Sequence, residues 1–258
     1  MEINTIRKRL SSVKGGRFAQ AAAPAKVFSI VLSDIIGDPL DMIASGPAVP
    51  DTSTCAQAIE ISERYGLKLS DKARELLNQE TPKELTNVST QITGSVKELC
   101  RAAANAAKSL GYEPVILTDR LCCEAREAGS FLGSIALSNK DLGKKTAYIA
   151  GGETIVHLKG TGKGGRNQEI ALSAAELISG AQNVAVFSVG SDGTDGPTDA
   201  AGGYADGDTL TDMDKKGINL KAFLENNDAY NALKAVDGLI ITGPTGTNVN
   251  DVAVLLIG

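Results

Sequence analysis

Aromatic residues and histidine are scarce in this sequence. It has no tryptophan, and aromatic residues make up 4% of its 258 residues, so isoleucine, leucine, valine and alanine must supply most of the apolar core. The only histidine, His157, shares one face of a predicted strand with Ile155 and Lys159. No catalytic triad can be assembled around it, and we interpret it as a structural residue.

Cysteine motifs, long apolar runs and an excess of positive charge are also missing. The four cysteines (Cys55, Cys100, Cys122 and Cys123) have no CxxC spacing, which argues against a zinc site and favours reduced thiols. No stretch has the length of a transmembrane helix, and residues 1–10 lack the apolar segment of a signal peptide. We therefore expect a cytoplasmic protein with no membrane partner. The net charge of −5 argues against a dedicated nucleic-acid-binding protein.

Segments typical of strands alternate with segments typical of helices along most of the chain, which predicts an α/β fold. The run 26–34 is short, apolar and continuous, as in a buried parallel strand. Ser95 and Glu98 form a capping box at the start of a predicted helix. Two predicted strands, 146–150 and 154–159, flank a glycine pair as in a hairpin, so we expect a mixed sheet.

The N-terminal part gives two further predictions. The opening segment to residue 13 is predicted to be a basic amphipathic helix with Ile3, Ile6 and Leu10 on its apolar stripe. The stretch 79–90 contains a proline and several threonine, serine and asparagine residues, so we interpret it as a passage between two lobes. The predicted domains are therefore 1–88 and 89–258, and the core of the second comprises about 145–258.

Two carboxylates four residues apart, Asp34 and Asp38, follow the first predicted strand in a glycine-containing loop. At such a place they can hold Mg²⁺, or one of them can accept a hydroxyl proton. The alternative is that both cap turns or the next helix, as aspartate does in many Asx turns. Spacing alone favours the capping role, and both hypotheses stay open at this point.

A glycine-rich loop, 160–165, precedes a predicted helix that begins at Arg166. Glycines at a helix start allow backbone N–H groups to approach an anion, and the helix dipole favours negative charge there. The Arg166 guanidinium adds a fork for phosphate or carboxylate. The loop lacks the Lys-Ser/Thr pair of a Walker A motif. A flexible exit from the hairpin is the alternative, and anion binding is favoured over it.

Three aspartates, Asp192, Asp195 and Asp199, lie close together in the loop after another predicted strand. Carboxylates at this spacing repel one another unless a cation or donors are near, which favours a ligand site over a solvated turn. The loop lacks the spacing and the terminal glutamate of an EF-hand. Because the loops of α/β sites gather at one edge of the sheet, we expect Asp192 to face the loop of Arg166 and at least one other aspartate to cap a turn.

Several segments, in order along essentially the whole chain, resemble one known family. Those that resemble the MOFRL domain are Gly-Gly-Glu-Thr at 151–154, Gly-Lys-Gly-Gly-Arg-Asn-Gln-Glu at 162–169, Gly-Ser-Asp-Gly-Thr-Asp-Gly at 190–196 and Thr-Gly-Pro-Thr-Gly-Thr-Asn-Val-Asn-Asp at 242–251. Those that resemble the glycerate kinase domain preceding it are Ile-Asn-Thr-Ile-Arg-Lys at 3–8, Val-Lys-Gly-Gly at 13–16, Leu-Ser-Asp-Ile-Ile-Gly-Asp at 32–38, Ile-Ala-Ser-Gly-Pro at 43–47 and Pro-Asp-Thr-Ser-Thr at 50–54. The resemblance implies the remnant of a Rossmann-like glycerate kinase domain followed by a MOFRL domain with a mixed sheet.

The family makes 2-phosphoglycerate from D-glycerate and ATP with Mg²⁺, so the resemblance implies a glycerate 2-kinase that binds D-glycerate and a nucleotide. It implies active-site roles for Asp34, Arg166 and Asp192. Asp38 and Asp195 are the implied metal ligands. The implied substrate- and nucleotide-binding residues are Lys14, Ser45, Gly46, Glu153, Gly164, Gly165, Asn167, Thr247 and Asn248.

The resemblance also predicts a segment that these 258 residues do not contain. Members of the family carry a catalytic lysine and a Gly-Gly-Gly-Ser loop before the helix that here begins at Met1, so a separate chain that supplies this segment is a predicted partner. A smaller departure is Arg9, where many members have histidine. Three hypotheses remain: a kinase or the larger part of one, an NAD(P)-dependent hydroxypyruvate reductase, and a non-catalytic module that binds glycerate or nucleotide. The reductase would need a dinucleotide fingerprint after an early strand, and the sequence has none.

Overall fold

The computed structural model describes residues 2–258, and the chain divides between Thr93 and Gly94 into two units. The division lies a few residues beyond the boundary predicted near residue 88, because the strand β2 (Val88–Gly94) begins within the stretch interpreted as a passage. Among residues 2–258, no helix combines the length and the apolar character needed to cross a bilayer.

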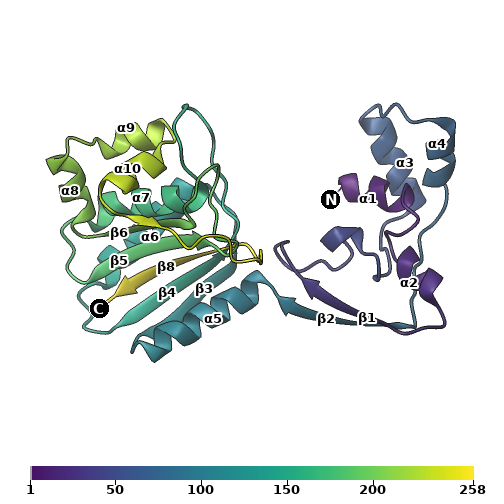
Figure 1. Cartoon of the computed structure of the whole chain (residues 1–258), viewed down its shortest axis with the longest axis horizontal. Helices are drawn as coiled ribbons and strands as arrows, with labels where there is room; N and C mark the ends of the chain where they lie inside the picture. The colour runs from purple at the N-terminus through teal and green to yellow at the C-terminus, as the bar shows by residue number, and fades with distance from the viewer. Residues whose placement is uncertain (1) are drawn as a thin grey trace. The chain divides into compact units, whose positions relative to one another are not determined.

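Unit 1, residues 2–93, is built from short helices and one pair of strands (Figure 1). Its elements are α1 (Glu2–Arg9), α2 (Arg17–Ala22), β1 (Val27–Leu32), the 3₁₀ helix η1 (Ile43–Ser45), α3 (Cys55–Arg64), α4 (Asp71–Leu77) and β2. Thr54 begins α3 with a capping box. The buried apolar cluster that joins α1, α3 and α4 is small and comprises Ile6, Ala58 and Leu77.

Helix α1 buries two of its charged side chains, and of the predicted stripe only Ile6 is buried. Lys8 and Arg9 are fully buried, whereas Ile3 is 72% exposed and Leu10 is 40% exposed. Lys8 Nζ lies 2.9 Å from Asp51 Oδ1. The predicted stripe was therefore right at Ile6 and wrong at Ile3 and Leu10. The burial of Lys8 and Arg9 was not predicted, because the polar partners that compensate these charges come from distant parts of the chain.

Asp51 is the centre of this buried ionic network. Besides the contact with Lys8, its carboxylate accepts hydrogen bonds from the backbone N–H and hydroxyl of Ser53 and from the hydroxyl of Thr81. Arg9 Nη1 lies 3.7 Å from Asp51 Oδ2. Burial by itself would raise the pKa of Asp51, but the hydrogen bonds outweigh it and lower the pKa from 3.8 to about 2. The network holds α1 against two later segments of unit 1.

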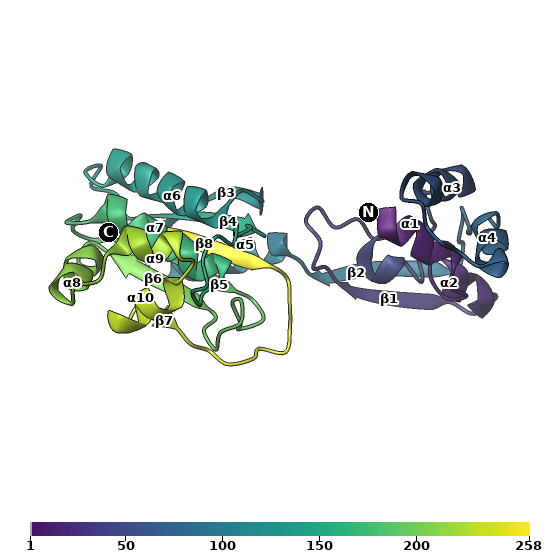
Figure 2. The same cartoon turned by 90° about the horizontal axis from the view of Figure 1, so that it is seen from above.

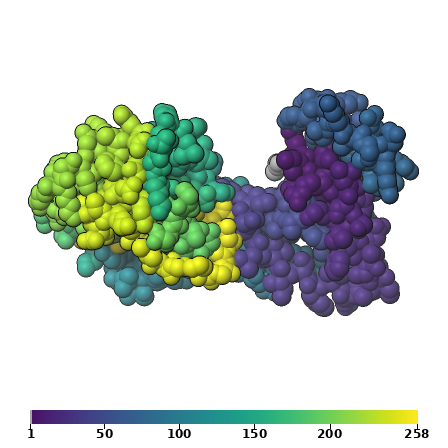
Figure 3. Space-filling view, turned by 45° about the horizontal axis from the view of Figure 1, so that its top comes forward, coloured from purple at the N-terminus to yellow at the C-terminus, as the bar shows by residue number. Residues whose placement is uncertain are grey.

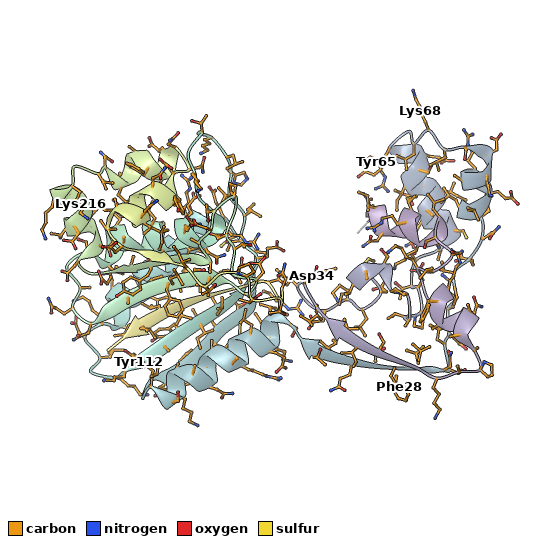
Figure 4. The ribbon with its side chains drawn as sticks, viewed as in Figure 1. Phe28, Asp34, Tyr65, Lys68, Tyr112 and Lys216 are labelled. Carbon is orange, nitrogen blue, oxygen red and sulfur yellow. The ribbon has the colours of Figure 1, made fainter. Side chains whose placement is uncertain are left out.

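Strand β1 has an apolar face that is exposed. Phe28, Ile30 and Leu32 alternate along it, with exposed fractions of 75%, 74% and 48%. Alternate residues of a strand lie on one face, so the three side chains form a single surface. Figure 4 shows Phe28 projecting away from the strand pair. A contiguous apolar surface of this kind is typical of a contact with another protein segment.

Unit 2, residues 94–258, contains one sheet with helices on both of its faces (Figures 1 and 2). Its elements are α5 (Val96–Ser109), β3 (Glu113–Leu121), α6 (Ala125–Asn139), β4 (Thr146–Gly152), α7 (Arg166–Ile178), β5 (Val184–Gly190), β6 (Gly202–Asp206), α8 (Thr209–Lys215), α9 (Leu220–Glu225), α10 (Ala229–Ala235), β7 (Leu239–Ile240) and β8 (Asp251–Ile257).

The sheet of unit 2 is mixed, which confirms the predicted fold class. Its strand order is β3-β4-β8-β5-β6-β7, in which β3 and β4 are parallel and the other neighbours are antiparallel. Val96 and Cys100 of α5 pack on one face against Ile149 and Val254. The larger apolar cluster lies on the other face, where α6 and α7 cover β5 and β8.

The predicted hairpin of strands 146–150 and 154–159 is wrong. β4 pairs with β3 along one edge and with β8 along the other, so neither edge is left for residues 154–159. That stretch makes an isolated bridge between Ile155 and Glu124 and otherwise runs as a loop toward α7.

Candidate functional site

The candidate site of unit 2 lies where two strands end and a third begins. Asp251, the first residue of β8, pairs with Gly152 at the end of β4 and with Gly190 at the end of β5. Glu153 follows directly after β4, and Arg166 is the first residue of α7. The carboxyl ends of β4 and β5 therefore meet the start of α7, which is the place where ligands bind in many α/β folds.

The Arg166 guanidinium is held by two carboxylates. Its Nε and Nη2 lie 2.5 Å and 3.1 Å from the two oxygens of Asp251, in a bidentate pair. Its Nη1 lies 3.2 Å from Glu153 Oε1. Burial alone would lower the pKa of Arg166, but the hydrogen bond and charge of Asp251 and the charge of Glu153 raise it above its ordinary value. Arg166 is thus a fixed positive charge at this edge of the sheet.

Asp195 occupies the N-terminus of α7. One carboxylate oxygen accepts from the backbone N–H and side chain of Asn167, at 3.1 and 3.2 Å, and the other from those of Gln168, both at 2.9 Å. Asp195 is 3% exposed, and its burial raises its pKa against the effect of these donors. The four donors match the four acceptor positions of a carboxylate. The structure therefore argues against Asp195 as a metal ligand and gives it the role of a helix cap.

Gly165 allows the carboxylate of Asp195 to come this close. A Cβ atom at residue 165 would lie 2.3 Å from Asp195 Cγ, so any side chain there would displace the cap. The positive end of α7, where we expected an external anion, thus already holds an internal one. Gly165 thus leaves room for Asp195, and a Cβ atom at Gly164 would instead lie 3.2 Å from the backbone nitrogen of Ala229. The implied role of both glycines in substrate binding stays a prediction.

Asn167 belongs to the same buried network. Its side chain donates to Asp195 and accepts a 2.6 Å hydrogen bond from the hydroxyl of Ser188 on β5. It is 1% exposed, so its role here is to join α7 to the sheet. Gln168 extends the network from Asp195 to the Thr198 hydroxyl at 3.1 Å. The side chain of Asn167 is therefore occupied by internal partners, and its implied role in ligand binding stays a prediction.

The glycine-rich loop packs against the segment between α9 and α10. The backbone N–H groups of Lys159 and Gly160 donate to the Asn227 side chain, and that of Lys163 donates to Asp228. The Lys163 ammonium lies 4.1 Å from the centre of the Tyr230 ring, in a cation–π contact. The backbone N–H groups of this loop and the charge of Lys163 therefore already have partners within unit 2.

Asp192 lies beside the same mouth of the sheet as Arg166. A Cβ atom at Gly190 would be 3.3 Å from Asp192 Oδ1 and 3.4 Å from Asp251 Oδ1, so the two carboxylates flank Gly190. Asp192 Oδ1 also accepts from the backbone N–H and hydroxyl of Thr194, which makes a local turn. Asp199, the third aspartate of this loop, accepts a 2.8 Å hydrogen bond from Tyr230.

Residues 242–250 fold over the loop that follows β5. Thr245 donates to the backbone carbonyls of Ser191 and Asp192, and the backbone N–H of Val249 donates to the Ser191 hydroxyl. Figure 3 shows the yellow stretch of this loop against the green surface of the other. Thr247 and Asn248 lie on its exposed part. The loop thus forms one wall beside Asp192.

Unit 1 carries its own group of predicted site residues. Lys14 donates to the carbonyl of Ala44 at 2.8 Å, and the next two backbone N–H groups donate to the carbonyls of Ser45 and Gly46. Ala44, Ser45 and Gly46 have φ angles of 50°, 62° and 59°, all left-handed. Three such residues in a row are uncommon, and backbone strain of this kind is often found at functional loops.

Asp34 and Asp38 lie in the loop after β1. Asp34 is exposed directly beyond the end of the strand, as Figure 4 shows. Asp38 has a φ of 54°, and its Oδ1 is buried with no hydrogen-bond partner among residues 2–258. Within that same range, no group of three or more histidine, cysteine, aspartate or glutamate side chains is placed to hold a metal ion. Any Mg²⁺ would therefore take most of its oxygens from water and substrate phosphates.

Three residues that the sequence did not single out complete the site: Asp251, Gln168 and Ser188. Asp251 carries the signal that could have identified it, since it is an acidic residue directly before a continuous apolar strand. Gln168 and Ser188 carry no such signal, because polar residues within a helix and a strand are usually exposed.

Comparison with known proteins adds the family. The MOFRL family model matches residues 146–251, and the model of a domain of unknown function, DUF4147, matches residues 1–78. The chain is 53% identical to a D-glycerate 2-kinase of Thermotoga maritima, over 99% of this chain and 62% of that protein. The chain therefore spans less than two thirds of that relative.

Two further comparisons agree with this. A crystal structure of glycerate kinase from Thermotoga maritima matches 100% of this chain and 63% of its own, with a TM-score of 0.97 and 52% identity. A glycerate kinase of Macaca fascicularis is 34% identical over 99% of this chain and 78% of its own length. This chain belongs to the glycerate kinase family of the MOFRL type.

Proposed function

We propose that this chain is the larger part of a glycerate 2-kinase, which transfers the γ-phosphoryl group of ATP to the 2-hydroxyl of D-glycerate. The observation that carries the proposal is the fixed Arg166 guanidinium at the carboxyl ends of β4 and β5, with Asp192 beside it. Phosphoryl transfer needs chiefly positioning and stabilisation of charge. Relatives named glycerate kinase support the same reading.

Arg166 is suited to bind an oxyanion. Asp251 occupies its Nε–Nη2 edge, so the end-on edge formed by Nη1 and Nη2 keeps one N–H from each nitrogen for a second bidentate partner. That partner would be the carboxylate of D-glycerate or the transferring phosphoryl group. Glu153, which is half-exposed and 3.2 Å from Nη1, would move aside when the anion binds.

The aspartates supply the remaining chemistry in this proposal. Asp34, which is exposed after β1, would accept the proton of the 2-hydroxyl of D-glycerate. The oxygen of that hydroxyl would then bond to the γ-phosphorus of ATP as the bond from this phosphorus to ADP breaks. In unit 1, the Oδ1 atom of Asp38 is buried with no hydrogen-bond partner among residues 2–258, and in unit 2 Asp192 lies beside Arg166. Each carboxylate by itself is a candidate ligand for Mg²⁺, which would neutralise phosphate charge when bound. The resemblance implies substrate- or nucleotide-binding roles for Lys14, Ser45 and Gly46 within unit 1, and for Thr247 and Asn248 within unit 2.

The two alternatives have less support. A hydroxypyruvate reductase would need a dinucleotide fingerprint, and the glycine-rich loop here is packed against Asn227 and Asp228. A non-catalytic binding module would retain affinity for D-glycerate or ATP without turnover. A coupled assay of ADP release with D-glycerate, together with NAD(P)H oxidation with hydroxypyruvate, distinguishes all three.

The 258-residue chain alone should turn over D-glycerate slowly. Relatives extend beyond it, and the catalytic lysine and Gly-Gly-Gly-Ser loop expected from the resemblance are not among its residues. The exposed face of Phe28, Ile30 and Leu32 is the surface that we propose such a segment covers. The rate of ADP release should stay well below about one per second. It should rise when the part of the Thermotoga relative that this chain does not match is added as a separate chain.

Two matched variants bear on this. Phe28→Ser with Ile30→Ser should abolish the gain from the added segment, whereas Leu158→Ser, at another exposed apolar residue, should leave it intact. Turnover of about one per second or faster by the chain alone would contradict the prediction.

Arg166→Lys should weaken anion binding more than Lys163→Arg does. Lysine offers a point charge in place of two parallel donors, so we expect a loss of about tenfold in affinity for D-glycerate or ATP. Lys163 lies over Tyr230, and arginine can make the same contact, so its change should stay within about twofold. Calorimetric titration of both variants measures the difference. Equal losses would mean that the loop acts only as a general source of positive charge.

A further inference from the structure

We infer that Asp251 is the positioning residue of this site: it fixes the plane of the Arg166 guanidinium so that the end-on edge is kept for the ligand. Arginine has a long, flexible side chain, and holding it in one orientation before a ligand arrives removes that ordering cost from binding. The inference deepens the proposed function and rests on it wherever ligand binding is concerned.

The first observation is the geometry of the pair. Asp251 bonds Arg166 through both carboxylate oxygens, at 2.5 Å to Nε and 3.1 Å to Nη2. Two parallel contacts define a plane, which a single contact cannot do. The Asp251 side chain is 8% exposed, against 34% for Arg166, so the carboxylate is the more buried partner of the pair.

The second observation is how the sheet holds Asp251. Its backbone pairs with β4 at Gly152 and with β5 at Gly190, so the residue is fixed on both sides. Both neighbours are glycines, and paired residues of adjacent antiparallel strands point to the same face. A Cβ atom at Gly190 would lie 3.4 Å from Asp251 Oδ1. Gly190 therefore leaves room for the Asp251 carboxylate, whereas a Cβ atom at Gly152 would meet the backbone oxygen of Leu121 at 2.1 Å.

The third observation separates Asp251 from the other carboxylate on Arg166. Glu153 approaches through one oxygen, at 3.2 Å from Nη1, and is 48% exposed. Its second oxygen accepts a 3.3 Å hydrogen bond from Asn250. A single contact from a half-exposed side chain does not define the guanidinium plane. Glu153→Gln therefore serves as a matched variant: it removes a negative charge next to Arg166 and leaves the bidentate pair with Asp251 in place.

The test uses the Nε–H signal of Arg166 in ¹⁵N-edited NMR spectra of the full chain, assigned by its absence in Arg166→Lys. We expect a signal that is shifted and protected from exchange with water in the wild type and in Glu153→Gln, and that loses its protection in Asp251→Asn. The amide of asparagine places a donor against a donor of the guanidinium. If Asp251→Asn fails to fold, Asp251→Ser gives the same comparison. Protection that survives either substitution would overturn the inference.

A second arm measures coupling with the ligand. Calorimetric titrations with D-glycerate and with ATP measure the effect of Asp251→Asn in two backgrounds. The substitution should weaken binding about tenfold when residue 166 is arginine, and less than about twofold when Arg166→Lys is also present. A role in folding alone would produce equal losses in both backgrounds and would overturn the inference. If the wild type binds neither ligand, the proposed function fails, and the Nε–H signal still decides the role of Asp251.

Discussion

Replacing Asp195 by alanine is expected to cost unit 2 about 3–5 kcal/mol of unfolding free energy. The carboxylate accepts four hydrogen bonds from Asn167 and Gln168 within a buried network, and alanine would leave those donors without a partner. The substitution would also remove the N-terminal cap of α7, and the loss of a helix cap by itself costs about 1 kcal/mol. Urea unfolding followed by circular dichroism measures the effect.

The matched control is Asp192→Ala in the same loop. Asp192 makes a local turn with Thr194 and lies in a less buried position, so its substitution should change the unfolding free energy by less than about 1 kcal/mol. The comparison should be made with and without Mg²⁺. An Asp195→Ala effect that appears only with the metal present would contradict the capping role and return Asp195 to the metal ligands.

Replacing Asp51 by alanine should destabilise unit 1 by about 3–5 kcal/mol, because it removes the fully buried carboxylate that pairs with Lys8 and Arg9. Lys8 would then keep only the partly exposed Asp41, and Arg9 only the half-exposed Glu80. Lys8 and Arg9 are fully buried, and Asp51 is the carboxylate that both approach. Hydrogen exchange of the α1 amides, followed by mass spectrometry, reports on this unit separately. Asp71→Ala, at the exposed start of α4, is the control and should leave exchange in α1 unchanged.

Acid should act on the same carboxylate. The pKa of Asp51 is lowered from 3.8 to about 2 in the folded protein, so its contribution to stability is complete above pH 3.8 and is lost as the pH falls toward 2. Glu80, whose pKa is lowered from 4.5 to about 2, titrates in an overlapping window. The acid dependence of exchange in α1 should therefore be reduced, but not abolished, in Asp51→Ala. An unchanged dependence would show that the buried network titrates elsewhere.

Local signals in the sequence predicted individual elements well. Ser95 caps the helix at Val96–Ser109 as predicted, since its hydroxyl accepts from the backbone N–H of Glu98. The second half of the predicted capping box does not form, because the Glu98 carboxylate pairs with Arg101. The hairpin prediction failed for a different reason. The apolar pattern at 154–159 is compatible with a strand, but strand pairing also requires a free edge on the neighbouring strand. Both edges of β4 are paired, one with β3 and the other with β8.

The site was harder to predict than the fold, because its key contacts join distant residues. Arg166 and Asp251 are 85 positions apart, and spacing along the chain contains no record of that pair. The spacing of the three aspartates after β5 is compatible with two different roles, a metal-binding loop and a helix cap. What distinguishes them is the position of the donors of Asn167 and Gln168, which the fold alone supplies.

The ionic centre of unit 1 also bears on how this part of the molecule responds to heat. The heat-capacity change of unfolding comes from exposing apolar surface and is reduced by exposing polar surface. A unit whose largest fully buried side chains are an arginine and a lysine should therefore unfold with a heat-capacity increment per residue below the usual ~12–15 cal/mol/K. Its stability would then vary with temperature along a flatter curve than that of unit 2, whose core is built from leucine, isoleucine, valine and alanine.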